Sequence, residues 1–216
     1  MMRRVTVFVL AAFLACDKPS SPPAPPRVDE TALAAQVGLS DSALAIIRDV
    51  AKSPLTGLHP TDSNGTELPP EGVSFGVAKA QIPDRIAQLR ERLGTGFLVF
   101  EAQRNYGTAP DSIGIIPSTD QFDILRVRNT DGINYDIDKD SVLVLVRQWH
   151  AQYDLEITGA ALDWFEARIR RPPANYREFA DVLFKVCPDI VTQGTNTVEA
   201  LVVEMRRSNL LYCWWD

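Results

Sequence analysis

The segment that decides the fold is Asn209-Leu210-Leu211-Tyr212-Cys213-Trp214-Trp215-Asp216, which reads as a β-strand. Strand alternation puts Leu210, Tyr212 and Trp214 on one face and Leu211, Cys213 and Trp215 on the other. Because both faces are apolar, the pattern predicts an interior strand that is covered on both sides. Two adjacent tryptophans bury a large area, so we expect the rest of the domain to pack around this segment.

The chain that leads to this strand alternates pairs of short strands with pairs of helices. From Gly96 onward the patterns predict strands at 97–100 and 113–116, helices at 118–127 and from Asp140 or Ser141 to Trp149, a hairpin at 155–158 and 162–169, and helices at 175–186 and 197–207. This order indicates an α+β domain over residues 96–216, in which helices pack on a mixed sheet. An elaborated ferredoxin-like sandwich is one arrangement that fits the order.

Residues 29–95 form an N-terminal extension to this domain. The patterns predict a helix after the Ser40-Asp41 cap, a Pro- and Gly-rich loop over 58–72, a short strand at 73–78, and a helix from Ile82 to Leu93. These elements are too few to bury a core of their own, so we expect them to join the same compact domain.

Several rare features agree in order and spacing with one known family. They are Arg171-Pro172-Pro173, Cys187-Pro188-Asp189-Ile190-Val191, Gln193-Gly194-Thr195 and Trp214-Trp215-Asp216. With these features, residues 95–216 resemble the bacterial family known as domain of unknown function 4253. The resemblance implies no activity, since that family has no agreed function. Relatives usually carry an aromatic residue where Cys213 stands, which argues against an essential thiol there.

The N-terminus has the pattern of a lipoprotein signal peptide over residues 1–15. Arg3-Arg4 is followed by an apolar stretch from Val5 to Ala15 and then by Cys16, the expected site of cleavage and lipidation. The apolar stretch is too short for a permanent membrane span. An ordinary secretory signal and an uncleaved anchor are the alternatives. Residues 16–28 then contain a Pro/Ser-rich tether.

This pattern predicts an exported, membrane-anchored lipoprotein of the bacterial cell envelope. Asp17 resembles the signal that retains some lipoproteins at the inner membrane, although the leaflet stays open. The chain has a net charge of −6, and loss of Arg3 and Arg4 with the signal peptide makes the mature protein more acidic. An acidic domain argues against nucleic acid as a partner. The expected partners are the membrane, through the lipid, and a protein or a small polar ligand.

Residues suited to metal binding or catalysis are scarce. His59 and His150 are the only histidines, and we predict no metal and no cofactor. The acidic run 136–141 lacks the glycine and the twelfth-position glutamate of a calcium loop, so Asp140 is better explained as a helix cap. A thiol-based site would need Cys187, His150 and Asp189 to converge. A disulfide between Cys187 and Cys213 also stays open.

The strongest remaining feature is a set of aromatic and charged residues expected to gather near the last strand: Trp149, Trp164, Arg168, Arg171, Trp214, Trp215 and Asp216. Either an arginine clamps Asp216 and locks the strand, or the set lines a pocket for a polar ligand. We favour the first interpretation.

The scarcity of residues suited to catalysis favours a non-catalytic binding module. The alternatives are an envelope hydrolase that uses Cys187, His150 and Asp189, and an immunity-type protein that neutralises a toxin.

Overall fold

The computed structural model describes residues 28–216. The predictions for the signal peptide, Cys16 and most of the tether therefore lie outside the described residues. The helices are α1 (Glu30–Gln36), α2 (Asp41–Ala51), α3 (Ile82–Leu93), α4 (Asp123–Arg128), α5 (Lys139–Tyr153), α6 (Tyr176–Val186) and α7 (Val198–Ser208). The strands are β1 (Leu55–Leu58), β2 (Gly72–Val77), β3 (Leu98–Gln103), β4 (Asp111–Ile116), β5 (Leu155–Ala160), β6 (Trp164–Ile169) and β7 (Leu210–Trp214).

All seven strands form one mixed sheet in the order β1-β2-β4-β3-β5-β6-β7, which confirms the α+β class. The β3–β5 pair is parallel and the other pairs are antiparallel. β2, α3 and β3 make a split β-α-β unit with β4 between its two strands, as in ferredoxin-like folds. The next strand, β5, adds beside β3, so the sheet continues toward β7 in an order of its own.

The element order predicted from Gly96 onward agrees with the structure. Two features of the sequence reading were wrong. β1 lies in the region predicted to join the helix at 41–51 directly to a loop, and it pairs with β2 at the edge of the sheet. Helix α5 begins at Lys139, because Asp138 and not Asp140 accepts a hydrogen bond from the backbone N–H of Ser141.

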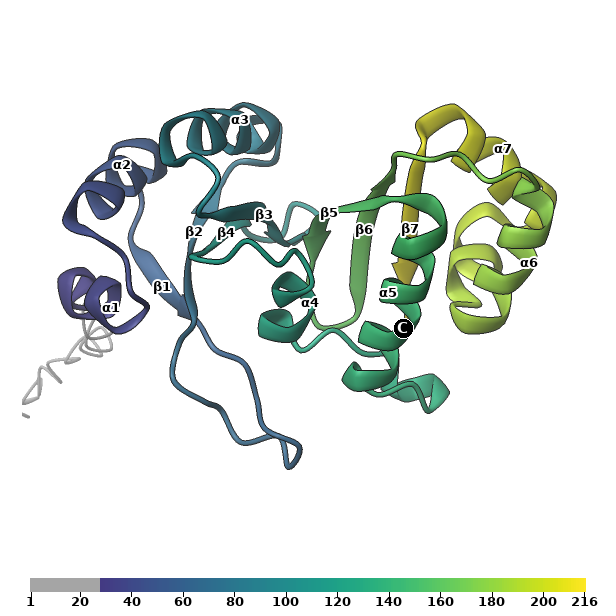
Figure 1. The fold of residues 1–216 in the computed structure, drawn as a ribbon, viewed down its shortest axis with the longest axis horizontal. Coiled ribbons are helices and arrows are strands. Elements are labelled where there is room, and N and C mark those ends of the chain that lie inside the picture. Colours follow the sequence, from purple (N-terminus) through teal and green to yellow (C-terminus); the bar gives the residue numbers. More distant parts are fainter. Residues whose placement is uncertain (1–27) are drawn as a thin grey trace, which may run out of the picture.

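Two hydrophobic cores lie on opposite faces of this sheet. Val99 belongs to the core under α1–α3, whereas its neighbour Phe100 belongs to the core under α4 and α5. Adjacent strand residues point to opposite faces, so the two helix groups cover different sides. Figure 1 shows α1–α3 at one end of the molecule and α6 and α7 at the other end, beside β7.

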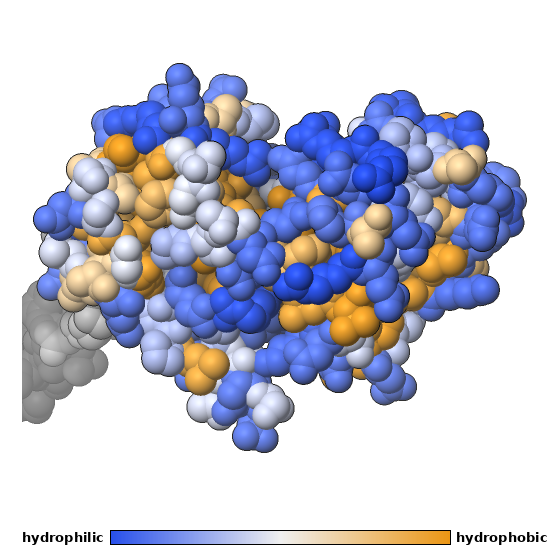
Figure 2. Space-filling view, viewed as in Figure 1, coloured by the Kyte–Doolittle hydropathy of each residue, from blue (hydrophilic) through white to orange (hydrophobic). Residues whose placement is uncertain are grey.

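The covering is incomplete, because the face that α2 and α3 cover over β1–β4 continues over β5–β7 without a helix directly on it. On β6 this face carries Trp164, Glu166 and Arg168, while Phe165 and Ala167 enter the opposite core. In the view of Figure 2 most of the surface is hydrophilic, with hydrophobic residues in separate patches. The open part of the sheet face is where the candidate site lies.

Candidate functional site

The terminal strand β7 is an edge strand, which corrects the expectation of an interior one. Its free edge is covered by the segment that follows α6. The Cys187 Sγ lies 2.7 Å from Trp214 O and 2.8 Å from Trp214 N, so the thiol takes the place of a neighbouring strand. The Trp215 indole donates to Val186 O at 2.9 Å. An otherwise exposed row of backbone groups is thereby satisfied.

The expected arginine clamp on Asp216 was wrong. The backbone N–H of Asp216 donates to Asp189 Oδ2 at 2.8 Å, so a carboxylate holds this end of the strand. Arg168 lies 4.0 Å from Glu156, and Arg171 donates to the carbonyls of Ala151 and Gln152. The strand is therefore fixed by hydrogen bonds to its backbone.

The Asp189 carboxylate connects three segments of the chain through hydrogen bonds. It is buried, and it accepts hydrogen bonds from Tyr135 at 2.7 Å and from Gln193 at 3.1 Å in addition to Asp216. Burial by itself raises the pKa of this carboxyl, but the hydrogen bonds outweigh it and the pKa is lowered. An ionised Asp189 thus joins β7, the π-helical segment Ile190–Thr195 and the loop that carries Tyr135.

Cys187, His150 and Asp189 are not brought together as a catalytic set. His150 Nδ1 lies 2.9 Å from Leu155 O and 3.3 Å from Gln121 Nε2. The Cys187 thiol is engaged with the backbone of Trp214. No hydrogen bond among the described residues joins any two of the three side chains, so the geometry gives a thiolate no base and no orienting acid.

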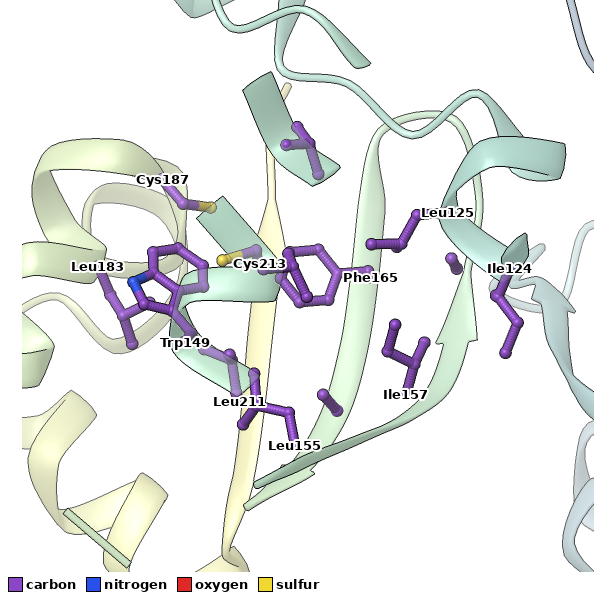
Figure 3. Packing of buried hydrophobic residues seen from close by; sticks show 14 of the residues in the cluster. Ile124, Leu125, Trp149, Leu155, Ile157, Phe165, Leu183, Cys187, Leu211 and Cys213 are labelled. Atoms are coloured by element: carbon purple, nitrogen blue, oxygen red, sulfur yellow. The ribbon is translucent and has the colours of Figure 1, made fainter. Parts of the chain in front are cut away.

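Cys187 and Cys213 are both free, buried thiols. Figure 3 shows their sulfur atoms inside the core near Trp149 and Leu183. Burial, together with a hydrogen bond donated to Cys187, raises the pKa of the Cys213 thiol well above its usual value. Such a thiol stays protonated and is a poor nucleophile.

The predicted aromatic and charged set divides between the two faces of the sheet. Trp149 packs against Phe179 with ring centroids 6.0 Å apart, and Trp215 against Phe165 at 6.1 Å, both in the core under α4 and α5. Trp164 and Trp214 lie opposite each other on β6 and β7 and face the open side. Of the predicted residues, Trp164 and Trp214 line the recessed surface described next.

Arg104 is the centre of that surface. Its guanidinium lies 4.4 Å from the Trp164 ring centroid and 5.5 Å from that of Tyr212. Nη2 is 2.6 Å from Glu101 and 3.1 Å from Glu166. Burial would lower the pKa of Arg104, but these two carboxylates raise it. The cation is therefore permanent and held between aromatic and acidic groups.

The absence of a side chain at Gly159 allows the close packing of backbone and Trp164 beside Arg104. A Cβ at Gly159 would lie 2.9 Å from Glu101 O and 3.1 Å from the Trp164 ring. Glycine at this position therefore allows β5 to pair with β3 and the Trp164 ring to lie flat below Arg104. Trp164 is only 2% exposed although it lies outside both cores.

Three neighbouring recesses, of about 340, 350 and 430 Å³, all share Arg104 and Tyr212. We call this surface the aromatic groove and define it by Arg104, Tyr106, Trp164, Glu166, Tyr212 and Trp214. The first recess runs toward α6 and α7 and is lined by Leu183, Leu201 and Met205 among other residues. The second and third are bounded by Tyr106, which is 70% exposed.

The groove is acidic overall. Four carboxylates (Glu101, Asp163, Glu166 and Glu204) line the three recesses, together with two cationic side chains (Lys79 and Arg104). Arg104 pairs with Glu101 and Glu166, and Glu204 pairs with Arg207 at 2.7 Å. Among the described residues, Asp163 is therefore the lining carboxylate without an ion pair, and it adds negative charge at the rim.

Sequence reasoning missed Arg104, Tyr106, Glu166 and Tyr212 as site residues. Arg104 and Tyr106 lie in a polar connection between β3 and β4, where only the strand order brings them beside β6. Glu166 and Tyr212 lie in segments that were predicted as strands. Pairing these two strands in register would have placed the two side chains next to each other.

The described part of the chain offers no ready metal centre. Within residues 28–216, no group of three or more His, Cys, Asp and Glu side chains is arranged to hold a metal ion. In the same residues, no helix combines the length and the apolar character needed to cross a membrane.

Comparison with known proteins agrees with the resemblance drawn from the sequence. No curated protein and no solved structure matches the chain. Residues 112–216, from β4 to the last strand, match the model of the family described as Domain of unknown function (DUF4253).

Proposed function

We propose that this protein is a non-catalytic binding module whose aromatic groove receives a basic, partly apolar segment of another protein. The observation that carries the proposal is the setting of Arg104. Its guanidinium is stacked on Trp164 and Tyr212 and paired with Glu101 and Glu166. A surface that already holds one guanidinium in this way has the chemistry to hold another.

A second cation would bind beside Arg104, where the rim is acidic. Trp214 and Tyr106 offer further ring faces, and Glu204 and Asp163 offer carboxylates. The net charge of −6 favours approach of a basic partner. The partner's cation would be neutralised by Asp163, and by Glu204 in exchange for Arg207, while Arg104 keeps its own two pairs.

The recess toward α6 and α7 supports an apolar component in the partner. It has about 340 Å³ of space between Leu183, Leu201, Met205 and Trp214. This space suits one or two aliphatic side chains, whose burial would contribute affinity that a purely charged surface lacks. Alternation of basic and aliphatic residues in an extended segment would satisfy both parts of the groove.

The second part of the proposal is the cellular location of the protein. We infer that Cys16 is lipidated after removal of residues 1–15, so that the module stands on a membrane of the cell envelope. The Pro/Ser-rich segment Pro19–Pro26 would act as a spacer that lets the groove face an envelope partner. This inference rests on the sequence alone.

The test is a titration of the purified protein with acetyl-Leu-Arg-Leu-Arg-amide, followed by tryptophan fluorescence and calorimetry. The control peptide has glutamate in place of both arginines. Trp214→Ala should weaken binding by about tenfold or more, as expected for an aromatic anchor. Glu204→Arg should also weaken binding, because it reverses the charge of the rim.

The matched control variant is Glu199→Arg, which makes the same charge change on α7. Glu199 pairs with Arg177 and lines none of the three recesses. Equal loss of binding in both variants would reduce the effect to net charge and refute a specific groove. Binding of the glutamate peptide as tight as that of the arginine peptide would also contradict the proposal.

A further inference from the structure

A second cavity, of about 550 Å³, lies where the loop between β1 and β2 meets the segment from α4 to α5. Its lining includes Arg128, Asn129, Lys139, Ile133 and Leu162. It shares no lining residue with the aromatic groove.

Arg128, the last residue of α4, is an unpartnered cation in the wall of this cavity. Its Nε is buried without any hydrogen-bond partner. No ion pair or hydrogen bond among the described residues involves its guanidinium, and burial lowers its pKa. Arg126, two residues earlier, is paired with both Glu71 and Asp123. A guanidinium that is partly buried, with its Nε unsatisfied and no counter-charge, is costly, so an anion is the ligand that would suit it.

The cavity is held in shape by its own polar residues. Asn129 Oδ1 accepts from the backbone N–H of Thr61 at 2.7 Å, and Lys139 Nζ donates to the carbonyls of Thr61 and Asp62 at 2.6 and 2.9 Å. These bonds fix the β1–β2 loop over the cavity through two residues that follow Arg128 in sequence. A ligand would therefore meet a largely preformed site.

Three carboxylates on the same cavity limit the charge of that ligand. Asp62, Asp131 and Asp138 each accept hydrogen bonds from backbone N–H groups of their own segments. They are thus engaged locally and do not pair with Arg128, but they repel a multiply charged anion. A monoanion with one planar carboxylate fits better than a phosphate dianion, because it matches the bidentate geometry of a guanidinium.

The rim of the cavity adds an apolar element. Ile133 is 65% exposed and Leu162 is 56% exposed, and both line the cavity. A ligand that covered these two side chains would bury apolar area now in water.

We propose that this cavity binds a carboxylate that carries an apolar group, with Arg128 as the anion-binding residue and Ile133 and Leu162 as the apolar contact. A peptide C-terminus with an aliphatic last residue and a small aliphatic acid share this chemistry. The site is independent of the aromatic groove, so either proposal can fail without the other.

The experiment titrates the full chain with N-acetylleucine and, in parallel, with N-acetylleucinamide, its neutral counterpart. The Arg128 Nε–Hε resonance is followed by NMR, and affinity is measured by calorimetry. N-acetylleucine should shift this resonance and the amide should not. Arg128→Gln should weaken binding by about tenfold to a hundredfold, as for loss of a charge-assisted pair. Arg147→Gln, at an exposed arginine outside the cavity, should bind as the wild type does.

Three results would overturn the proposal: equal shifts by the acid and the amide, no shift of the Arg128 resonance up to the solubility limit, or unchanged affinity in a folded Arg128→Gln variant. If that variant does not fold, the wild-type resonance and the acid–amide comparison still decide the question. A further titration with acetyl-leucyl-leucine distinguishes a peptide C-terminus from a small aliphatic acid. Tighter binding than that of N-acetylleucine would indicate a peptide C-terminus.

Discussion

The two adjacent tryptophans near the end of the chain should respond to the same substitution in different ways. Trp215 is 3% exposed, packs on Phe165 and donates to Val186 O. Trp214 lies on the other face, half-buried at the aromatic groove. The structure therefore predicts that Trp215→Ala mainly lowers stability and that Trp214→Ala mainly lowers binding.

The expected magnitude for Trp215→Ala follows from burial. A buried Trp→Ala change costs about 3–5 kcal/mol, and loss of the indole donor leaves Val186 O unsatisfied. Typical domains have only about 5–15 kcal/mol in total, and a chain of this size loses roughly 2–4 °C in thermal midpoint per kcal/mol. The midpoint should therefore fall by roughly 6–20 °C. For Trp214→Ala we expect about 1–2 kcal/mol, since part of the ring is already in water.

The assay is urea unfolding followed by far-UV circular dichroism, which does not depend on tryptophan emission. Trp215→Phe is the matched variant, because it keeps much of the apolar bulk but removes the indole donor. Its cost should fall between wild type and Trp215→Ala. Equal costs for Trp214→Ala and Trp215→Ala, or a larger cost for Trp214→Ala, would refute the assignment of the two rings to different faces.

The remaining predictions concern the lipid anchor, the Asp189 carboxylate, the thiols and the unpaired arginine. Cys16→Ser should abolish lipid-dependent processing and membrane fractionation in a bacterial host, and unchanged fractionation would contradict the anchor. Asp189 has a lowered pKa in the folded protein, so its contribution to stability is present above the unfolded value near 3.8 and is lost as pH falls through the lowered folded value. The difference in unfolding free energy between wild type and Asp189→Asn should consequently shrink below about pH 4. Cys187 and Cys213 are buried, so a thiol reagent applied to the Cys16→Ser protein should label both only after unfolding, and rapid native labelling would contradict their placement. Arg128→Met should raise the thermal midpoint by roughly 2–4 °C, because it removes the cost, about 1 kcal/mol, of a guanidinium whose Nε is buried and unpaired, and a lower midpoint would indicate a structural partner.

The sequence predicted the elements of this fold better than their places in the sheet. The cap at Ser40, whose side chain accepts a hydrogen bond from the Ala43 N–H, and the helix from Ile82 to Leu93 depend on local sequence and were readable. The position of β7 was misread because its free edge is covered by the segment after α6, while the face that carries Tyr212 and Trp214 lines a recess bounded by residues of α7. Apolarity on both faces of a strand reports burial, but it does not distinguish an interior strand from a covered edge.

The candidate site shows the same limit more strongly. Trp164 and Trp214 were selected for their residue type, together with Trp149 and Trp215, which lie on the opposite face. Side-chain type gave no means of separating the two pairs, because the face depends on register and strand order. Arg104 was not selected at all, since its partners Glu166 and Tyr212 are 62 or more residues away in sequence.

The limits of the family segment bear directly on the groove. Residues 112–216 supply Trp164, Glu166, Tyr212 and Trp214, whereas Arg104 and Tyr106 precede this segment. β3, which also precedes it, lies between β4 and β5 and joins the two halves of the sheet. A fragment cut to the matched residues would lose the strand that connects β4 to β5 as well as the cation at the centre of the groove. The aromatic residues Trp164, Tyr212 and Trp214 of the groove therefore lie in the matched segment, whereas its central cation, Arg104, lies in the region that precedes it.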